Sequence, residues 1–422
     1  MALTNMGAEA AVAARDVLEV EPVYRDVPAA LTESVAPTPV PAPRLLHLHR
    51  PLARDLRLDP ERLARDDGVA VLSGNRIPAG TDPVAMGYGG HQFGNWVPEL
   101  GDGRAVLLGG VTDRAGVRRD VQLKGAGRTP FSGMGDGRAE LFPVLGEYLA
   151  SENMAGLGIP TTRSLAMVGT GETVARGDYT TGAILTRVAT SHIRVGTFEY
   201  LARNGDPEGV RTLADHVIAR HYPAIARSAA PYRDLLAEVS RRTGDLIARW
   251  MLVGFIHGVL NTDNISVVGE TLDYGPFAWM DTYHPQACFS AIDIMGRYAY
   301  DQQPRIGSWN LCRFAETLLP LLDDDVEQAR TAAYDALEAY DTAFDRAYRD
   351  GLCAKIGLEA GEDADVELAQ ALLSRMAAQR ADFTLTFRRL SELSASDASA
   401  DDPVRSLFDD PESFDAWAAD WR

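Results

Sequence analysis

The sequence predicts an α+β protein in which a sheet-rich N-terminal lobe is followed by a helical C-terminal lobe. From about residue 69 to 200, short apolar runs alternate with glycine turns, as they do in strands. From about residue 212 onward, apolar residues recur at helical spacing. A length of 422 residues is enough for two lobes. We expect a partly extended N-terminal arm at 1–45, an N-lobe with glycine loops at 46–196, and a helical C-lobe at 197–422.

The N-lobe elements are predicted from these runs. Strands of a mixed sheet are expected in VAVLSG (69–74), in the stretch 87–110, in RRDVQLKGAG (118–127) and in GAILTRVATSHIRVG (182–196). A helix is expected within 139–158 and should end at the glycines 156–158. Its apolar residues at helical spacing are Leu141, Val144, Leu145, Tyr148 and Leu149.

The C-lobe is predicted to be helical over 212–260, 324–350 and 365–393. In the first of these segments, one face carries the recurring apolar residues Leu235, Leu236, Val239, Leu246, Ile247, Trp250 and Met251.

Composition excludes several classes of protein. A formal net charge of −19 argues against a general nucleic-acid binder, so any bound phosphate needs a local cationic pocket. The three cysteines, Cys288, Cys312 and Cys353, give neither a disulfide framework nor a C-x-x-C metal signature. Neither a signal peptide nor an apolar span of membrane length is recognised, and we therefore expect a cytoplasmic protein without a membrane partner.

Lysine is rare, because only Lys124 and Lys355 occur among 41 cationic residues. A retained lysine suggests a place where a guanidinium cannot replace a compact ammonium. Lys124 lies on an apolar strand and Glu147 follows on a predicted helix, as in kinases, where the strand lysine grips phosphates and the helix glutamate orients that lysine. The alternative is an ordinary surface pair. Lys355, in a polar helical stretch, is expected at the surface.

Two glycine loops flank the strand that carries Lys124. The first contains Gly101, Gly103 and Arg104, and the second, GAGRTPFSGMGDGRA, contains Asp136 and Gly137. Dense glycine lets backbone N–H groups approach an anion, although such patterns also mark simple turns.

Arg187 and Arg194 follow on a presumed strand pair. The alternative to phosphate binding is one buried ion pair and one solvated side chain.

The stretch HGVLNTDNISVVGETLDYGPF (257–277) resembles the catalytic and metal loops of protein kinases. Asn264 and Asp273 fall at the positions of the two metal ligands, and their oxygens suit Mg²⁺ or Mn²⁺. Val259 occupies the position of the catalytic aspartate, so Asp263 is the remaining candidate base. Asp263 could instead form an Asx-turn, and His257 is interpreted as a structural anchor of the loop.

Several long strings resemble the selenoprotein O / YdiU family over roughly residues 36–390. They are YGGHQFGNWVPELGDGRAVLLGG, DVQLKGAGRTPFSGMGDGRAEL, SENMAGLGIPTTRSLAMV, LTRVATSHIRVGTFE, HGVLNTDNISVVGETLDYGPF and GRYAYDQQPRIGSWNL. The resemblance implies a protein-kinase-like bilobal fold with an inverted nucleotide. It also implies a nucleotidyltransferase that moves AMP from ATP to Ser, Thr or Tyr of proteins (AMPylation) and releases pyrophosphate.

Roles for individual residues follow from this resemblance. It implies Asp263 as the proton acceptor, Asn264 and Asp273 as metal ligands, and Glu147 as the residue that orients Lys124. The nucleotide would contact Gly101, Gly103, Arg104, Lys124, Asp136, Gly137, Arg187, Arg194 and Asp273. The expected partners are ATP, Mg²⁺ or Mn²⁺ and protein substrates, and the chain is expected to be a monomer. Three alternatives stay open: uridylyl transfer, kinase-type phosphoryl transfer, and an ATP-binding pseudokinase scaffold, which Val259 favours.

Overall fold

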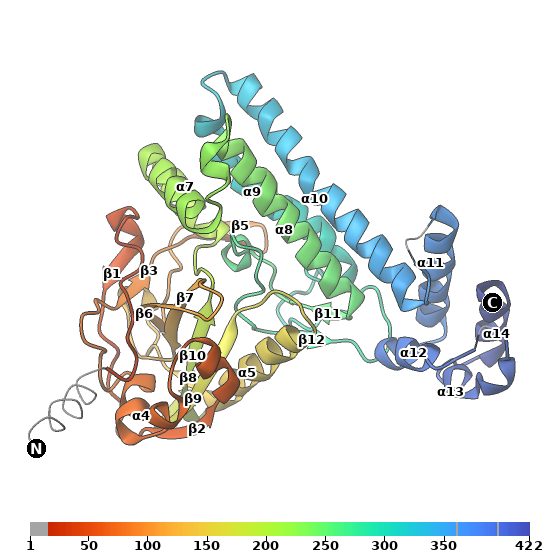
Figure 1. The fold of residues 1–422 in the computed structure, drawn as a ribbon, viewed down its shortest axis with the longest axis horizontal. Helices are drawn as coiled ribbons and strands as arrows, with labels where there is room; N and C mark the ends of the chain where they lie inside the picture. The colour runs from red at the N-terminus through yellow and green to blue at the C-terminus, as the bar shows by residue number, and fades with distance from the viewer. Residues whose placement is uncertain (1–15, 360–361, 395) are drawn as a thin grey trace, which may run out of the picture. The chain divides into compact units, whose positions relative to one another are not determined.

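The computed structural model describes residues 16–359, 362–394 and 396–422, and the chain forms two compact units (Figure 1). The first comprises Met1–His221 and Ser266–Asp273, and the second comprises Tyr222–Ile265 and Tyr274–Arg422. Residues 1–15 of the predicted arm lie outside the described part. Among the described residues of the arm, Leu18 and Leu31 are buried, and β1 (Thr32–Ser34) pairs with β3 (Val84–Met86).

The first unit is built on one sheet in the order β1-β3-β6-β7-β10-β9-β2, with β8 paired to β10. The remaining bounds are β2 (Arg44–Leu48), β6 (Ala105–Thr112), β7 (Arg118–Lys124), β8 (Ala139–Glu140), β9 (Arg163–Arg176) and β10 (Asp178–Ala189). Two short strands, β4 (Gly90–Gln92) and β5 (Asn95–Val97), form a separate hairpin. All pairs between named strands of the described chain are antiparallel, so the prediction of a mixed sheet is wrong.

The predicted strand VAVLSG is also wrong, because its residues lie mainly in helix α4 (Asp66–Leu72). Asp66 and Asp67 occupy the first turn, where carboxylates stabilise the helix dipole. Val71 and Leu72 are fully buried in the main apolar core, which also contains residues of α2 (Arg50–Asp55) and α3 (Pro60–Leu63). Burial against this core outweighs the strand preference of valine.

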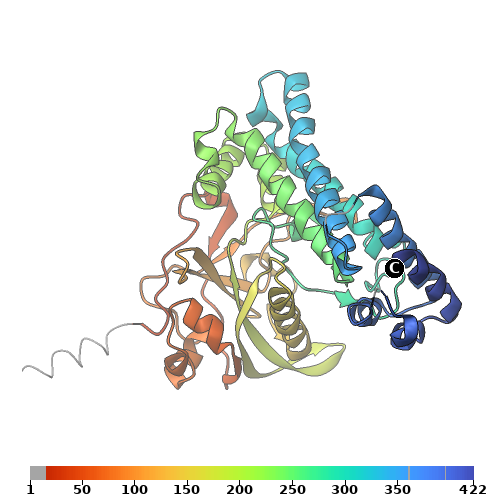
Figure 2. The same cartoon turned by 45° about the vertical axis from the view of Figure 1, so that its right-hand side comes forward.

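The predicted helix at 139–158 is confirmed as α5 (Leu141–Gly156), which lies on one face of the sheet (Figure 2). Val144 and Tyr148 pack with Leu185 of β10, whereas Leu145 and Leu149 are exposed. The alternation of β10 puts Leu185 on the α5 face and Ile184 in the opposite core. Two helices, α6 (Val195–Arg203) and α7 (Pro207–His221), complete this unit, although we expected both in the helical lobe.

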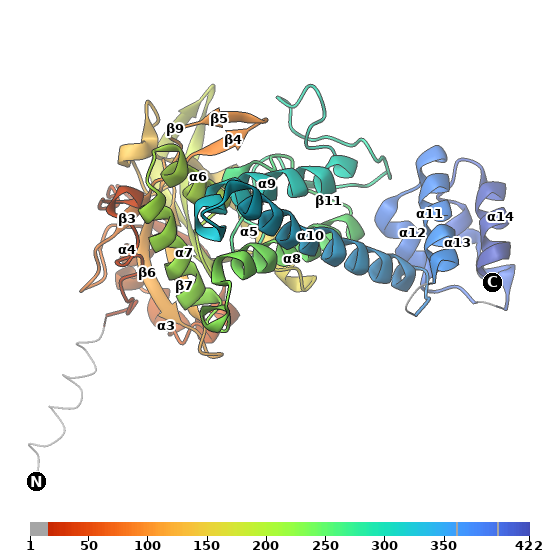
Figure 3. The ribbon, with the colours of Figure 1, turned by 90° about the horizontal axis from the view of Figure 1, so that it is seen from above.

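The second unit is mainly helical, and α8 (Pro231–Leu252), α9 (Gln303–Leu322) and α10 (Val326–Lys355) pack together (Figure 3). The predicted apolar face of α8 is confirmed, since its seven named residues are all buried. A hairpin of β11 (Phe255–Ile256) and β12 (Ala278–Trp279) interrupts the helices. The chain then forms α11 (Asp363–Ala378), α12 (Phe383–Leu390), α13 (Asp402–Arg405) and α14 (Pro411–Trp421). Among the described helices, none is both long and apolar enough to cross a membrane.

Candidate active site

The predicted pair of Lys124 and Glu147 is present on the α5 face of the sheet. The Nζ of Lys124 lies 2.6 Å from Oε2 of Glu147, and the two side chains are 13% and 3% exposed. The alternative of a solvated surface pair is therefore wrong. Arg187 lies opposite Gln122 in the β7–β10 register, and Lys124 lies opposite Leu185. Because side chains two positions apart share a face, Arg187 reaches the same carboxylate as Lys124.

Arg187 binds Glu147 with two donors, since its Nη2 and Nε lie 2.6 and 2.9 Å from Oε1. Its Nη1 donates to Oε1 of Gln122 at 3.2 Å, and Gln122 in turn donates to the buried Asp102 at 3.0 Å. Sequence reasoning missed this extension through Gln122 and Asp102. The glycine loop gave one signal, because Asp102 stands between Gly101 and Gly103.

Asp273 joins this cluster because the segment Ser266–Asp273 is part of the first unit. Thr271 accepts a backbone hydrogen bond from Thr162 and donates one to Pro160, both at 2.9 Å. Asp273 itself has a left-handed backbone with φ of 59°. Its Oδ1 lies 2.6 Å from Nη2 of Arg187 and 3.4 Å from Nζ of Lys124.

Arg194 approaches Asp273 from the start of α6, and its Nη1 donates to Oδ2. Its guanidinium also lies over the ring of Tyr88, 4.4 Å from the centroid. Both Arg187 and Arg194 are almost fully buried. The alternative in which one of the two arginines is solvated is therefore wrong.

The charged side chains of this cluster shift one another's pKa values. Burial alone would raise the pKa of Asp273, but Arg187, Arg194 and Lys124 hold it well below its usual value. Burial lowers the pKa of Lys124, and neighbouring Arg187 lowers it further, against the opposing effect of Glu147. Three cations thus surround two ionised carboxylates. An excess of cations in a buried place is suited to holding phosphate oxygens.

The two glycine loops are joined to each other beside this cluster. Thr129 donates to the carbonyl of Asp102 at 2.8 Å, and Gly125 donates to the carbonyl of Arg104 at 2.7 Å. Gly137 has φ of 70°, and a Cβ there would lie 2.0 Å from the carbonyl oxygen of Gly127. Only a glycine at position 137 lets the two ends of the second loop approach each other this closely.

Two of the predicted nucleotide contacts are exposed. Arg104 and Asp136 are both exposed. Oδ2 of Asp136 accepts a hydrogen bond from Nη1 of Arg176 at 2.9 Å. The hydrogen bond from Arg176 lowers the pKa of Asp136 to about 2. Asp136 therefore closes the second glycine loop onto β9 in this structure.

The predicted catalytic loop belongs to the second unit, where Asp263 and Asn264 lie in the short helix η4 (Thr262–Asn264). Asp263 is buried, and the Nδ2 of Asn264 donates to the carbonyl of Val259 at 2.8 Å. His257 is fully buried next to Trp250, 5.5 Å between ring centroids, in agreement with its interpretation as a structural anchor.

The same loop is held by side chains of the helical unit. Gln303 accepts from the backbone N–H of His257 at 2.9 Å, and Asn310 donates to the carbonyl of Leu260 at 2.8 Å. The hydroxyl of Tyr298 donates to Oδ1 of Asn261. The backbone before Asp263 is therefore fixed at three points.

Asn264 and Asp273 are the candidate metal ligands. The ionised carboxylate of Asp273 and the carbonyl oxygen of Asn264 are hard donors that fit Mg²⁺ or Mn²⁺. Among the described residues, no group of three or more His, Cys, Asp or Glu side chains could hold a metal ion. Each of the two oxygen donors by itself suits such a metal, which takes its remaining ligands from water or phosphate oxygens.

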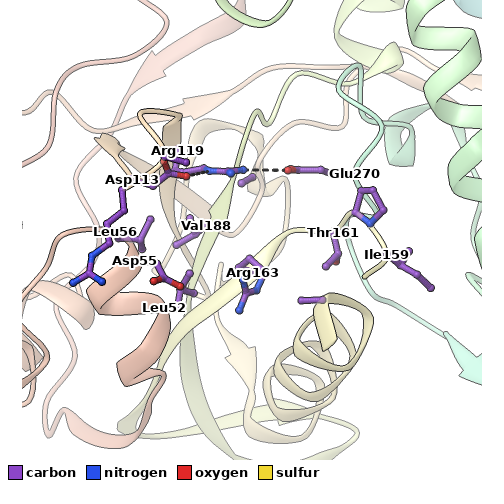
Figure 4. A pocket seen from close by; sticks show the side chains of 15 residues that line it. Leu52, Asp55, Leu56, Asp113, Arg119, Ile159, Thr161, Arg163, Val188 and Glu270 are labelled. Atoms are coloured by element: carbon purple, nitrogen blue, oxygen red, sulfur yellow. Dashed lines mark hydrogen bonds and ion pairs between the residues drawn. The ribbon is translucent and has the colours of Figure 1, made fainter. Parts of the chain in front are cut away.

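A separate cavity of about 460 Å³ lies in the first unit (Figure 4). Val188 and Ala189 of β10 line it, whereas Lys124, Glu147, Arg187, Arg194 and Asp273 are not among its lining residues. Glu270 also lines it and accepts from Thr190 at 3.0 Å, while Arg119 lies 3.5 Å from the same carboxylate group. Sequence reasoning did not identify this cavity, because its lining comes from five separate segments.

Comparisons with known proteins define the class of protein. The protein nucleotidyltransferase YdiU of Rhodopseudomonas palustris (strain HaA2) is 59% identical over 399 residues, 94% of this chain and 81% of that protein. The protein of the same description from Bradyrhizobium sp. (strain ORS 278) is 60% identical over 389 residues, 92% of this chain and 79% of that protein. A family model described as protein adenylyltransferase SelO matches residues 15–422. The chain belongs to the SelO family of protein adenylyltransferases and is a nucleotidyltransferase enzyme.

Proposed function

We propose that this enzyme transfers AMP from ATP to the hydroxyl groups of Ser, Thr or Tyr in proteins and releases pyrophosphate. The observation that carries the proposal is the buried cluster of Lys124, Glu147, Arg187, Arg194 and Asp273 in a member of an adenylyltransferase family. A sheet-rich unit with a strand lysine and a helix glutamate, followed by a helical unit, supports a kinase-like bilobal fold.

The cations of the first unit bind the phosphates in this proposal. Lys124, Arg187 and Arg194 contact the triphosphate, and Arg104 contacts it from the first glycine loop. The backbone N–H groups of the glycine loops add donors that cost little reorganisation. Glu147 keeps Lys124 and Arg187 in place while the nucleotide enters and leaves.

A divalent cation, when bound, would neutralise phosphate charge, and Asn264 and Asp273 would hold it. Asp263 accepts the proton of the acceptor hydroxyl as the acceptor oxygen attacks the α-phosphorus. One bond forms between that oxygen and the α-phosphorus, and the bond from the α-phosphorus to the oxygen bridging to the β-phosphate breaks. Pyrophosphate leaves with the electron pair of the broken bond.

Label transfer tests the proposal directly. Purified protein is incubated with Mg²⁺ or Mn²⁺ and ATP labelled at the α- or the γ-phosphate, and intact mass is measured. We expect label on protein from the α position only, and its loss in Asp263→Ala and Asp263→Asn. Asp335→Asn, an exposed carboxylate of α10, is the matched control and should retain transfer.

The outcomes separate the alternatives. Label from the γ position would mean phosphoryl transfer, and preferential label from α-labelled UTP would mean uridylyl transfer. Val259, at the position of the kinase catalytic aspartate, is the observation that favours a pseudokinase scaffold. ATP binding without any label transfer would support that scaffold and contradict the proposal.

A further inference from the structure

One segment of the second unit exposes a group of large apolar side chains. It lies between β12 and α9, extends as a long loop in Figure 3, and ends in the short helix η5 (Tyr300–Gln302) directly before α9. Phe289, Ile292, Ile294 and Met295 are 50%, 73%, 91% and 91% exposed. We call these four residues the apolar tip. Single exposed apolar residues are common, but four within seven positions mark a surface for interaction.

The apolar tip is held in place by hydrogen bonds at its base. The buried carboxylate of Asp293 accepts from the backbone N–H of Tyr298 at 2.7 Å and from that of Arg297 at 2.9 Å. The Sγ of Cys288 lies 3.4 Å from the same carboxylate. The guanidinium of Arg297 lies over the ring of Trp309 in α9, 4.7 Å from the centroid. The segment is therefore tied to α9 and does not depend on the tip for its conformation.

The same base is connected to the loop that carries Asp263. Tyr298, whose backbone binds Asp293, donates its hydroxyl to Asn261, two residues before Asp263. A protein acceptor has to bring its hydroxyl to Asp263 during transfer. The tip segment is thus joined by hydrogen bonds, through the buried Tyr298, to the loop of the second unit that an acceptor must reach.

The charge of the whole protein and of the two ends of the segment indicates which acceptors fit. Asp281 and Asp301, at the two ends of the segment, are exposed, and the whole protein carries a net charge of −19. Acidic polypeptides would be repelled, whereas basic ones would be attracted.

We propose that the apolar tip is the docking surface for the protein acceptor, and that it selects segments with apolar and basic side chains beside the acceptor hydroxyl. This inference rests on the proposed function, because it names the substrate class of the same site. The acceptor buries its apolar side chains against Ile294 and Met295, and its basic side chains lie toward Asp281 and Asp301.

Two synthetic peptides serve as probes. Each has one central tyrosine; the first is flanked by leucine and arginine, and the second by serine and aspartate. Label transfer from α-labelled ATP is measured for each peptide at 50 and 300 mM salt. We expect kcat/KM to be at least about tenfold higher for the first peptide, with part of this preference lost at high salt.

The variant that tests the surface is the double substitution Ile294→Ser with Met295→Ser. Both side chains are exposed, so folding is expected to be unaffected. We expect the preference between the peptides to fall to about twofold or less, through KM for the peptide, while the thermal shift with ATP is unchanged. The matched control is Val326→Ser, an exposed apolar residue at the start of α10, which should keep the preference.

Contrary results are distinguishable. An undiminished preference in the double variant overturns the docking proposal, as does equal transfer to both peptides by the unchanged enzyme. A dimer that the double variant converts to a monomer, without a change in peptide preference, would assign the tip to self-association and overturn it as well. If the double variant lost binding to phosphatidylglycerol vesicles but kept its peptide preference, the tip would be assigned to membrane binding and the docking proposal would be overturned. Absence of transfer to peptides, proteins and the enzyme itself would instead contradict the proposed function.

Discussion

Replacement of Asp273 by Asn tests whether this carboxylate balances the buried cations. The substitution keeps the shape of the side chain, and asparagine tolerates the left-handed backbone that Asp273 adopts. Asp273 faces Arg187, Arg194 and Lys124, and its side chain is 22% exposed. Breaking a buried ion pair costs about 3–5 kcal/mol, and after partial screening by solvent we expect a loss of about 2–3 kcal/mol at pH 7.

The contribution of Asp273 to the free energy of unfolding should depend on pH in a definite direction. The pKa of Asp273 in the folded protein is far below its unfolded value, so its stabilisation is present above about pH 3.9 and is lost as pH falls toward the folded value. The difference between the two proteins should be constant from pH 5 to 8. Below pH 3.9 it should narrow by about 1.4 kcal/mol for each pH unit.

The assay is urea-dependent hydrogen exchange of peptides from β7 and β10, which reports on the first unit alone. Asp335→Asn is the control, because that carboxylate is exposed on α10. Metal-free ATP should raise the melting temperature of Asp273→Asn more than that of the unchanged protein, since the cluster then has a larger excess of cations. A stability difference below about 0.5 kcal/mol at pH 7, or one that is the same at pH 7 and pH 3, would refute the charge-balance argument.

Three further predictions concern other parts of the molecule. Lys124→Met should lower AMP transfer by about 10²–10³-fold, and Lys124→Arg should not restore it, because a guanidinium fork replaces a single ammonium; single-turnover label transfer measures both. Tyr298→Phe removes the hydrogen bond to Asn261 and should lower the transfer rate by about tenfold, with ATP affinity unchanged in calorimetry; an unaltered rate would contradict a positioning role. Burial lowers the pKa of Lys355 to about 8, so its acetylation by acetic anhydride, followed by mass spectrometry, should reach half-maximum near that pH, whereas titration near pH 10 would show an ordinary surface amine.

Local pattern was sufficient for several elements of the fold. Regular spacing predicted α5 and the buried face of α8, since amphipathic helices repeat their apolar residues along one side. It failed for VAVLSG, where valine suggested a strand and tertiary burial produced α4. Local pattern also predicted that Lys355 lies at the surface, although the Nζ of Lys355 lies 4.4 Å from the ring centroid of Phe387. That contact comes from a different helix, which spacing within one helix cannot reveal.

The candidate site was predictable where a residue type had a single chemical use. Lys124 and Glu147 were paired from the rarity of lysine and the order of strand and helix, and the structure contains that ion pair. The burial of both Arg187 and Arg194 was not predictable, because it depends on Asp273, which is distant in sequence. The network through Gln122 has the same cause, since its partners come from separate strands and loops.

The two carboxylates of the cluster differ in accessibility, and this difference separates their roles. An enzyme that binds a polyphosphate has to remain folded when the nucleotide is absent, so its buried cations need internal partners. Glu147 is only 3% exposed and binds Lys124 and Arg187 from within the unit, whereas Asp273 is 22% exposed. An incoming phosphate or metal ion can therefore reach Asp273 far more readily than Glu147. We accordingly expect the cations to exchange Asp273 for phosphate oxygens when ATP binds, which leaves the Asp273 carboxylate available for the metal, while Glu147 keeps its partners throughout the reaction.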